Sequence, residues 1–320
     1  MMRLSALLIA ALSSSAFAQD PTYPTKPLRF VVGQAPSGAT DIVARLVAAK
    51  MTEVMGQNIV VENRSGAAGS IAAAAVAKSA PDGYTVLIVS SSYSINPSLY
   101  SRLPFDPERD LVPVSLLAEA PFLLVVHPSM PVKSVKDLIA LAKQKPGVLT
   151  YGSGGNGSSG HLAGVLFESG AGIHLTHVAY KGAGQALVDV LGGQVSFMFG
   201  SVLSVTPHIK QGRLRVLAQT GAKRSSALPE IVTMAEAGVP NYATSTWYGL
   251  LVPAGTQAAI VNSLSAAAKK AVLSAEIRDR LRSDGADPVA SSPVEFQKHL
   301  AREIAKWHKV VRSAGIAPES

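Results

Sequence analysis

Short apolar runs rich in β-branched residues alternate along this chain with longer stretches in which apolar residues recur every three or four positions. Runs of the first kind predict strands, and stretches of the second kind predict amphipathic helices. Residues 28–32 (LRFVV) form the first predicted strand, and Ile42, Leu46 and Met51 belong to the apolar stripe of a helix over 38–55. This alternation predicts an α/β fold with largely parallel sheets.

The same pattern continues to the C-terminus. Further strands are predicted over residues 58–62, 84–89, 122–127, 148–151, 176–180, 195–199, 214–219 and 244–252. Further helices are predicted over residues 66–78, 135–143, 158–169, 183–191, from the turn after 199 to about 211, and over 293–313. The last helix has an apolar stripe that we assign to core packing: Phe296, Leu300, Ile304, Trp307 and Val311.

The length of 320 residues is long for one core and suits two lobes. We find no flexible linker, so we expect the chain to cross between lobes twice through extended segments. One lobe is expected to comprise residues 19–121 and 250–320, and the other residues 122–249, with a two-strand hinge near 121–123 and 245–250. Such a hinge allows two lobes to close around a ligand.

The N-terminus has the pattern of a secretory signal peptide. Arg3 supplies a positive charge, residues 4–12 are apolar, and residues 16–18 (AFA) form a small-x-small cleavage signal. A membrane anchor is the alternative, but a spanning helix needs roughly 20 apolar residues, about twice the length of this run. We therefore expect residues 1–18 to be removed and the mature protein to be soluble and periplasmic.

The composition excludes several classes of site. The chain has no cysteine, which excludes disulfides, a thiol nucleophile, a Cys-based metal site and a lipid-modified cysteine. Its formal net charge is +8, and loss of Arg3 with the signal peptide leaves +7. The basic residues are scattered rather than clustered with aromatic residues, so nucleic-acid binding is not indicated. A positive field of this kind favours anionic solutes.

A loop rich in glycine and serine, residues 151–161 (YGSGGNGSSGH), lies between a predicted strand and a predicted helix. Glycines let a ligand approach the backbone, and the first N–H groups of a helix carry partial positive charge, so the loop favours an anion. A flexible linker has a similar composition, but the position between strand and helix favours binding. The candidate ligand residues here are Ser153, Asn156, Gly157, Ser158, Ser159 and His161.

Enzyme and cofactor hypotheses are weaker. The loop contains GxGxxG, but a dinucleotide site needs a carboxylate at the end of the next strand, and residues 178–181 (VAYK) contain none. A hydrolase in which His161 acts with a serine of the loop is the alternative function, although no complete nucleophile, base and orienting set is apparent. His161 is equally suited to helix packing. His174 and His177 lie three apart on a predicted strand and would point to opposite faces, so we expect no metal site, no cofactor and no catalytic residue.

The loop after the first strand, residues 34–41 (QAPSGATD), occupies the equivalent position in the first lobe. Ser37 or Gly38 can cap the following helix, and Asp41 in its first turn serves either the helix dipole or a ligand. Two such turns, one per lobe, would place two helix N-termini on the walls of one cleft, beyond the carboxyl ends of the strands. Further candidates at strand ends are Ser91, Ser94, Tyr180, Lys181, Gly200 and Ser201. Lys181 either binds a carboxylate or lies in solvent.

An ordered set of segments resembles the Bug-type periplasmic receptors of tripartite tricarboxylate transporters over essentially the whole mature chain. The resembling segments are residues 23–27 (YPTKP), 37–45 (SGATDIVAR), 61–64, 66–69, 80–85 (APDGYT), 95–100 (INPSLY), 151–162, 180–182 (YKG), 191–195 (LGGQV), 235–240 (AEAGVP), 247–249 (WYG) and 253–256 (PAGT). Each segment is weak alone, and their order makes the resemblance specific.

The resemblance implies a two-lobed type II periplasmic-binding-protein fold and a receptor, not an enzyme, that binds a small carboxylate for uptake or sensing. It implies that amides, hydroxyls and bridging waters of the two loops hold the carboxylate. The residues at the corresponding positions are Ser37, Gly38, Asp41, Ser153, Asn156, Gly157, Ser158 and Ser159. The implied partner is a two-component membrane permease, with a membrane sensor as the alternative, and we expect a monomer. Ser37 replaces a usual glycine, and Ser196 and Gly200 replace usual acidic residues, so the solute itself is not determined.

Overall fold

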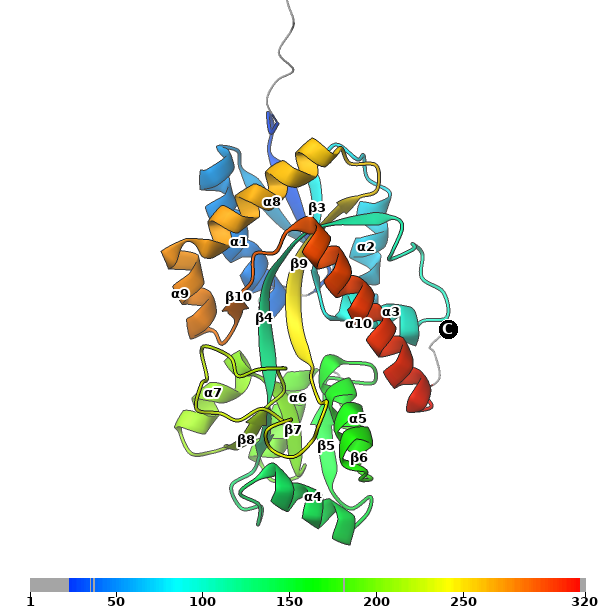
Figure 1. The fold of residues 1–320 in the computed structure, drawn as a ribbon, viewed down its shortest axis with the longest axis vertical. Helices are drawn as coiled ribbons and strands as arrows, with labels where there is room; N and C mark the ends of the chain where they lie inside the picture. Colours follow the sequence, from blue (N-terminus) through cyan, green and yellow to red (C-terminus); the bar gives the residue numbers. More distant parts are fainter. Residues whose placement is uncertain (1–22, 35, 37, 181, 317–320) are drawn as a thin grey trace, which may run out of the picture.

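The structure is a computed structural model that describes residues 23–34, 36, 38–180 and 182–316. The predicted signal peptide lies outside these ranges, and none of the helices within them is both long and apolar enough to cross a membrane. The chain forms two lobes stacked along the long axis of the molecule. Two long strands, β4 (Leu111–Val126) and β9 (Ser245–Pro253), run between the lobes (Figure 1).

The first lobe is built on a sheet in which β1 is flanked by two parallel strands, β2 and β3, and β9 continues the sheet antiparallel to β3. Its elements are β1 (Leu28–Val32), α1 (Ala39–Met55), β2 (Ile59–Asn63), η1 (Ala67–Gly69), α2 (Ser70–Ala77), β3 (Thr85–Ser90), α3 (Ser92–Leu99), α8 (Ala258–Leu273), α9 (Ala275–Ser283), β10 (Asp287–Pro288) and α10 (Pro293–Ser313). Both faces of β1 are buried: Phe30 packs in the core under α1 and α8, and Val31 packs in the core under α2 and α10. Helices on both faces explain why residues 30–32 of this strand form a continuous apolar run, whereas Arg29 is exposed.

The second lobe repeats the arrangement on a smaller sheet. Its elements are α4 (Val135–Gln144), β5 (Thr150–Ser153), α5 (Ser159–Ala171), β6 (Thr176–Ala179), α6 (Ala183–Leu191), β7 (Phe197–Ser201), α7 (Val202–Lys210) and β8 (Arg215–Gln219). β5 pairs in parallel with β6 and β7, and the last residues of β4 pair antiparallel with β7 and β8. Leu124 and Phe197 face one core, and Leu123 and Met198 face the other.

Strand β4 belongs to both sheets. Pro121 is the last of its residues that pairs with β9, and Phe122 is the first that pairs with β7. The prediction of a strand over 122–127 therefore captured only the second half of β4. The first half was not predicted as a strand because it contains Pro113 and Pro121, and proline lacks the N–H that a residue of a central strand donates. The structure accommodates the first half with irregular register between Pro113 and Ser115.

The prediction of largely parallel sheets is correct for the outer strands and wrong for the middle. β9 and β4 run antiparallel to their neighbours at the centre of the strand order β2-β1-β3-β9-β4-β7-β5-β6. The reason is topological, because a strand that returns from one lobe to the other runs opposite to the strand that left.

Helix α3 was also not predicted from the sequence. Pro97 lies inside it, and its serines favour a loop in isolation.

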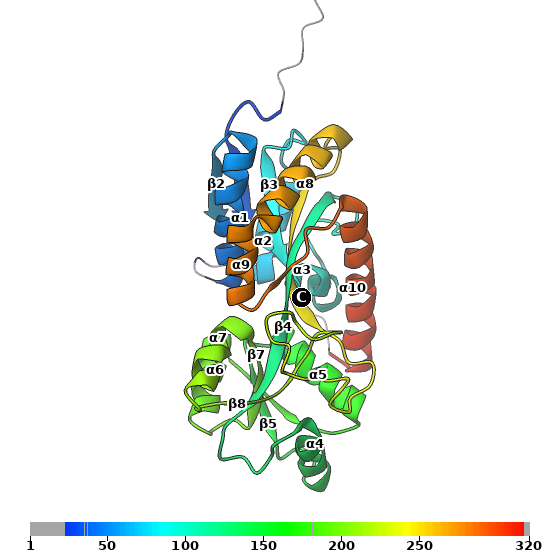
Figure 2. The ribbon, with the colours of Figure 1, turned by 60° about the vertical axis from the view of Figure 1, so that its left-hand side comes forward.

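Helix α10 confirms its prediction over 293–313. It begins with a capping box in which Ser292 and Glu295 bond to each other's backbone N–H, and Pro293 occupies its first turn. Its predicted apolar stripe is fully buried, and each such side chain contributes about 1.5–3 kcal/mol. Figure 2 shows that α10 descends from the first lobe to α5 of the second. There Trp307 and Leu162 share one apolar cluster.

Candidate functional site

The loops after β1 and β5 both lead into the N-terminus of a helix. α1 begins after Gly38, which is extended (φ −73°, ψ 162°) and provides no side-chain cap. α5 begins after Ser158, whose Oγ accepts the backbone N–H of His161 at 3.3 Å. The first N–H groups of each helix lack intrahelical acceptors and carry the positive end of the helix dipole. Each loop therefore has the electrostatics of an anion site.

The second-lobe loop contacts the first lobe through Ser91 and helix α3. Ser91, at the end of β3, places its Oγ 3.2 Å from the Oγ of Ser159, the first residue of α5. Ser91 also lies 3.4 Å from the Oγ1 of Thr246 on β9. Gly157 of the second lobe packs on Leu99 of α3 so closely that a Cβ atom would lie 2.2 Å from Leu99 Cδ1. The candidates Ser91, Gly157 and Ser159 thus lie at one contact between the lobes.

A cavity of about 40 Å³ lies between α1 and α7. Ser201 lines it together with Ala39, Ile42 and Thr246. Ser201 caps α7 by accepting the N–H of Ser204. The candidates Gly38 and Ser201 therefore lie at helix N-termini that border the same space.

Gly200 does not contribute to this space through a side chain. A Cβ atom there would lie 2.3 Å from Val205 Cγ1, so the packing of α7 on β7 requires a residue without a side chain. The acidic residue that the resemblance leads one to expect at this position has no room. Ser196 lies at the start of β7, where its N–H donates to Thr150 Oγ1 at 3.1 Å. This is the end of the strand opposite to the interlobe space, so an acidic residue there would not reach the candidate site.

The carboxylate of Asp41 is buried, and both of its oxygens accept hydrogen bonds from other side chains. Its Oδ2 accepts Arg45 Nε at 3.0 Å, and its Oδ1 accepts Asn63 Nδ2 at 2.9 Å. The same Asn63 nitrogen donates to the backbone oxygen of Gln34 at 3.1 Å. Asp41 and Asn63 therefore connect the start of α1 with the loop after β1. This geometry favours a role for Asp41 in shaping the loop over direct ligand contact.

Sequence reasoning missed two buried amides beside the first-lobe loop. Gln34 Nε2 donates to Ser90 Oγ at 3.3 Å and Ser92 Oγ at 3.4 Å, and Asn96 Nδ2 donates to Ala68 O at 3.2 Å. Within the described part of the chain, Gln34 Oε1 and Asn96 Oδ1 are buried without a hydrogen-bond partner. Both residues line a cavity of about 10 Å³, roughly the space of one water molecule. An isolated amide has no sequence pattern, so the sequence marked this region only through the loop over 34–41 and the segment INPSLY.

In the second-lobe loop, Ser153 and His161 point into the lobe. Ser153 Oγ donates to Gly155 O at 3.0 Å and lies 2.7 Å from His177 Nε2. His161 Nδ1 accepts the backbone N–H of Gly157 at 2.9 Å. The rings of His161 and His177 stack with centroids 4.0 Å apart. Burial and the neighbouring His177 lower the pKa of His161 to about 4, and burial lowers that of His177.

The remaining candidates have varied surroundings. Asn156 is exposed at the tip of the loop. The Tyr180 hydroxyl donates to Asp189 Oδ2 at 2.5 Å, and the Ser94 hydroxyl donates to the backbone oxygen of Ser91 at 2.8 Å. Both hydroxyls are therefore engaged within their own lobes. Ser37 and Lys181 lie outside the described residues.

The hydrolase alternative is not supported. The ring nitrogen of His161 that would deprotonate a serine instead accepts the Gly157 N–H. Ser153 contacts His177, but its side chain is buried, with 2% exposed. Among the described residues, no group of three His, Asp or Glu side chains could hold a metal ion.

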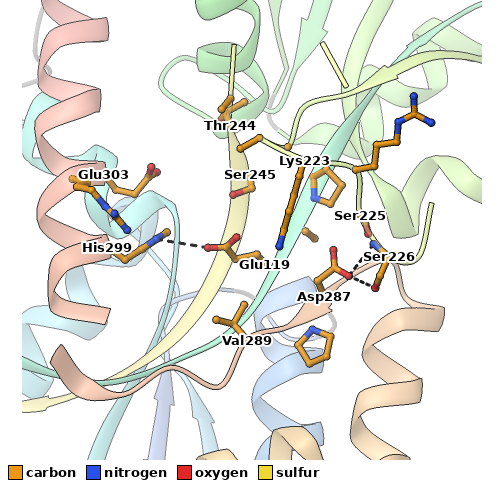
Figure 3. Close-up of a pocket in the computed structure, with 18 of the residues that line it drawn as sticks. Glu119, Lys223, Ser225, Ser226, Thr244, Ser245, Asp287, Val289, His299 and Glu303 are labelled. Carbon is orange, nitrogen blue, oxygen red and sulfur yellow. Dashed lines mark hydrogen bonds and ion pairs between the residues drawn. The ribbon is translucent and has the colours of Figure 1, made fainter. Parts of the chain in front are cut away.

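A larger cavity of about 1,120 Å³ opens beside β4, β10 and α10. Figure 3 shows charges of both signs along its walls, with Lys223 pointing toward Glu119. Glu119 lies 3.6 Å from His299 Nδ1. The backbone N–H of Ser226 donates to Asp287 Oδ1 at 3.1 Å, which connects the segment after β8 with β10. Glu119 and Asp287 therefore have partners within the protein, and the clearest feature of this cavity is a hydrogen bond between the lobes.

Known proteins match over most of the chain. The family described as the tripartite tricarboxylate transporter family receptor matches residues 43–316. Protein BugT of Bordetella pertussis is 37% identical over 311 residues, which cover 97% of this chain and 95% of BugT.

Solved structures agree with the sequence comparison. An R. palustris protein with adipate has a TM-score of 0.83 and 41% identity, over 93% of this chain and 100% of its own. MatC from Rhodopseudomonas palustris with bound malate has a TM-score of 0.77 and 32% identity, over 90% of this chain and 100% of its own. Fold and sequence together show that the chain belongs to the receptors of the tripartite tricarboxylate transporter family.

Proposed function

We propose that this protein is a receptor that encloses a small carboxylate between its lobes and catalyses no reaction. The observation that carries the proposal is the contact of Ser91 with Ser159, because it brings the residue after β3 in one lobe to the N-terminus of α5 in the other. The similar structures with adipate and with malate support a carboxylate as the ligand class.

The proposed site holds the carboxylate with neutral donors. The N–H groups at the starts of α1 and α5 and the hydroxyls of Ser91 and Ser159 are the groups suited to this task. Hydrogen bonds to a charged group contribute about 1.5–3 kcal/mol each. Asp41 does not repel such a ligand strongly, because Arg45 pairs with it.

The proposed lobes are residues 19–121 with 250–320, and residues 122–249, with the hinge near 121–123 and 245–250. The change of pairing partners along β4 supports this division. At the same place the Phe122 N–H donates to Thr220 Oγ1 at 2.8 Å, and the Thr244 N–H donates to Thr220 O at 2.9 Å. Thr220 therefore connects the two crossing segments where β4 changes partners, and we expect the lobes to bend there when they close on a ligand.

We also propose that the protein acts as a monomer outside the cytoplasm after removal of residues 1–18. Its partner in this proposal is a two-component permease that takes up the solute, with a membrane sensor as the alternative. The family match supports a transport partner. Deleting the gene separates the two: loss of solute uptake supports the permease, whereas normal uptake with lost gene induction supports the sensor.

Thermal unfolding with added acids tests the ligand class. The purified protein is heated with adipate, with malate and with the neutral control adipamide. A ligand present at about 100 times its Kd adds roughly 2.7 kcal/mol to the folded state, so at least one acid should raise the Tm while adipamide does not. Unchanged melting with a broad panel of mono-, di- and tricarboxylates would contradict the proposal. Native mass spectrometry of the purified protein then identifies any retained solute.

A further inference from the structure

We propose that His161 is a positioning residue that shapes the ligand loop of the second lobe from inside the lobe rather than by touching the ligand. Its effect on ligand affinity rests on the proposed function, whereas its effect on the loop does not. The side chain is buried, with 8% exposed, and its Nδ1 accepts the Gly157 N–H at 2.9 Å. His161 thus reaches back over the loop that precedes its own helix.

The loop needs such a contact because its backbone is unusual. Gly155 and Gly157 have φ values of +119° and +71°. Glycine reaches these conformations without strain, but it also loses the most conformational freedom when it is ordered. Gly157 is further confined by Leu99 of the first lobe. The hydrogen bond from Gly157 to His161 therefore selects one conformation from the many that the glycines allow.

His177 completes the arrangement at the other end of the loop. The Ser153 Oγ lies 2.7 Å from His177 Nε2 and 3.0 Å from Gly155 O, so this hydroxyl connects His177 with the loop. His161 accepts at Nδ1 and carries its proton on Nε2. The His161 ring is consequently neutral, and burial lowers the pKa of His177. The two rings stack on one another, and the ring of Tyr151 stacks on His177 at 4.9 Å, so each ring holds the orientation of the next.

The consequence concerns which donors remain for a ligand. The Gly157 N–H points to His161 and is not available to a ligand. The Ser158 N–H donates to Gly155 O at 3.2 Å, and the His161 N–H donates to Ser158 Oγ at 3.3 Å. The N–H groups of Ser159 and Gly160 are then the ones presented by the first turn of α5. Donors held in place before binding lose less entropy when the ligand arrives.

Substitutions that differ only in acceptor position test the proposal. His161→Asn keeps an oxygen where Nδ1 lies, because both atoms are bonded to Cγ. His161→Gln places its oxygen at the position of Nε2, and His161→Phe keeps a flat ring without an acceptor. His174→Phe is the control, since its side chain is 76% exposed on the same lobe. Each protein is examined by amide hydrogen exchange at Gly157 and by calorimetric titration with adipate and with malate.

We expect Gly157 to exchange at least about tenfold faster in His161→Phe and His161→Gln than in the wild type, with His161→Asn and His174→Phe close to the wild type. Affinity for whichever acid binds should fall about tenfold in the same two variants. Equal exchange at Gly157 in the wild type and in both acceptor-lacking variants would overturn the proposal. If the wild type binds neither these acids nor any acid of the thermal panel, the proposed ligand class fails, and the exchange rates still decide the role of His161. If His161→Phe does not fold, the comparison of Asn with Gln decides it.

Discussion

Ser91 and Ser159 lie in different lobes and 68 positions apart in the chain, and their hydroxyl oxygens are 3.2 Å apart. Ser91 ends the turn after β3, and Ser159 begins α5. The pair thus joins a strand end of the first lobe to a helix N-terminus of the second. A ligand held between the lobes would compete for these hydroxyls, which makes the pair the most direct place to test binding.

Replacement of Ser159 by alanine should weaken ligand binding without unfolding the protein. The change removes one hydroxyl that binds a charged group and keeps the backbone N–H, so a loss of about 1.5–3 kcal/mol is expected, or roughly ten- to 150-fold in Kd. Calorimetry with the best ligand from the thermal screen measures it. Ser169→Ala, exposed on the same helix, should bind normally. Equal affinity of Ser159→Ala and wild type would exclude this hydroxyl from the site.

Replacement of Asp287 by alanine should favour separated lobes. The change removes the hydrogen bonds from Ser226, which connect the segment after β8 with β10 beside the hinge. The ligand-free protein should then show a larger radius of gyration in small-angle X-ray scattering and a Kd that is higher by about two- to tenfold. Asp279→Ala on α9, whose partner Arg278 is its sequence neighbour, is the control. A radius of gyration equal to that of the wild type would show that this contact does not set the lobe angle.

The pKa of His161 predicts a dependence of stability on pH. Its pKa is about 4 in the folded protein and about 6.5 when unfolded. Between these values the unfolded state binds more protons, so the free energy of unfolding should fall as the pH falls from 6.5 to 4. Denaturant titrations across this range should show a shallower fall for His161→Phe than for the wild type. Parallel curves would mean that His161 titrates alike in both states.

Alanine at position 200 should destabilise the second lobe. Its Cβ would lie 2.3 Å from Val205 Cγ1, and overpacking of this kind costs about 1–3 kcal/mol. Urea unfolding measures the loss of stability. Adding Gly200→Ala to the variant Val205→Ala should cost less stability than adding it to the wild type. If Gly200→Ala is as stable as the wild type, the tight packing of α7 on β7 does not explain why position 200 is a glycine.

Much of the fold was predictable because its causes are local. The capping residues Ser292 and Glu295 and the buried stripe of α10 lie within a few turns of one another, so spacing alone reveals them. The loop over 151–161 was found in the same way, from glycines and serines between a strand and a helix. The two-lobed organisation followed from the length of the chain and from the order of its segments.

Neighbours from different segments were not predictable. His161 was considered as a ligand contact, but its partner is Gly157, and the ring that stacks on it, His177, lies on the adjacent strand β6. Asp41 and Asn63 are both visible in the sequence, yet their hydrogen bond depends on the pairing of β1 with β2. Spacing along a chain carries no information about such pairings until the register of the sheets is known.

The sequence by itself determined the secondary structure of α1 and α10, the α/β class and the chemistry of the two loops, because these depend on residues close together in the chain. Tertiary structure alone decided that β4 serves both lobes, that Ser91 meets Ser159, and that the ring of His161 points inward. Those outcomes depend on how strands pair and helices pack across long separations, where the burial of the whole core selects one arrangement.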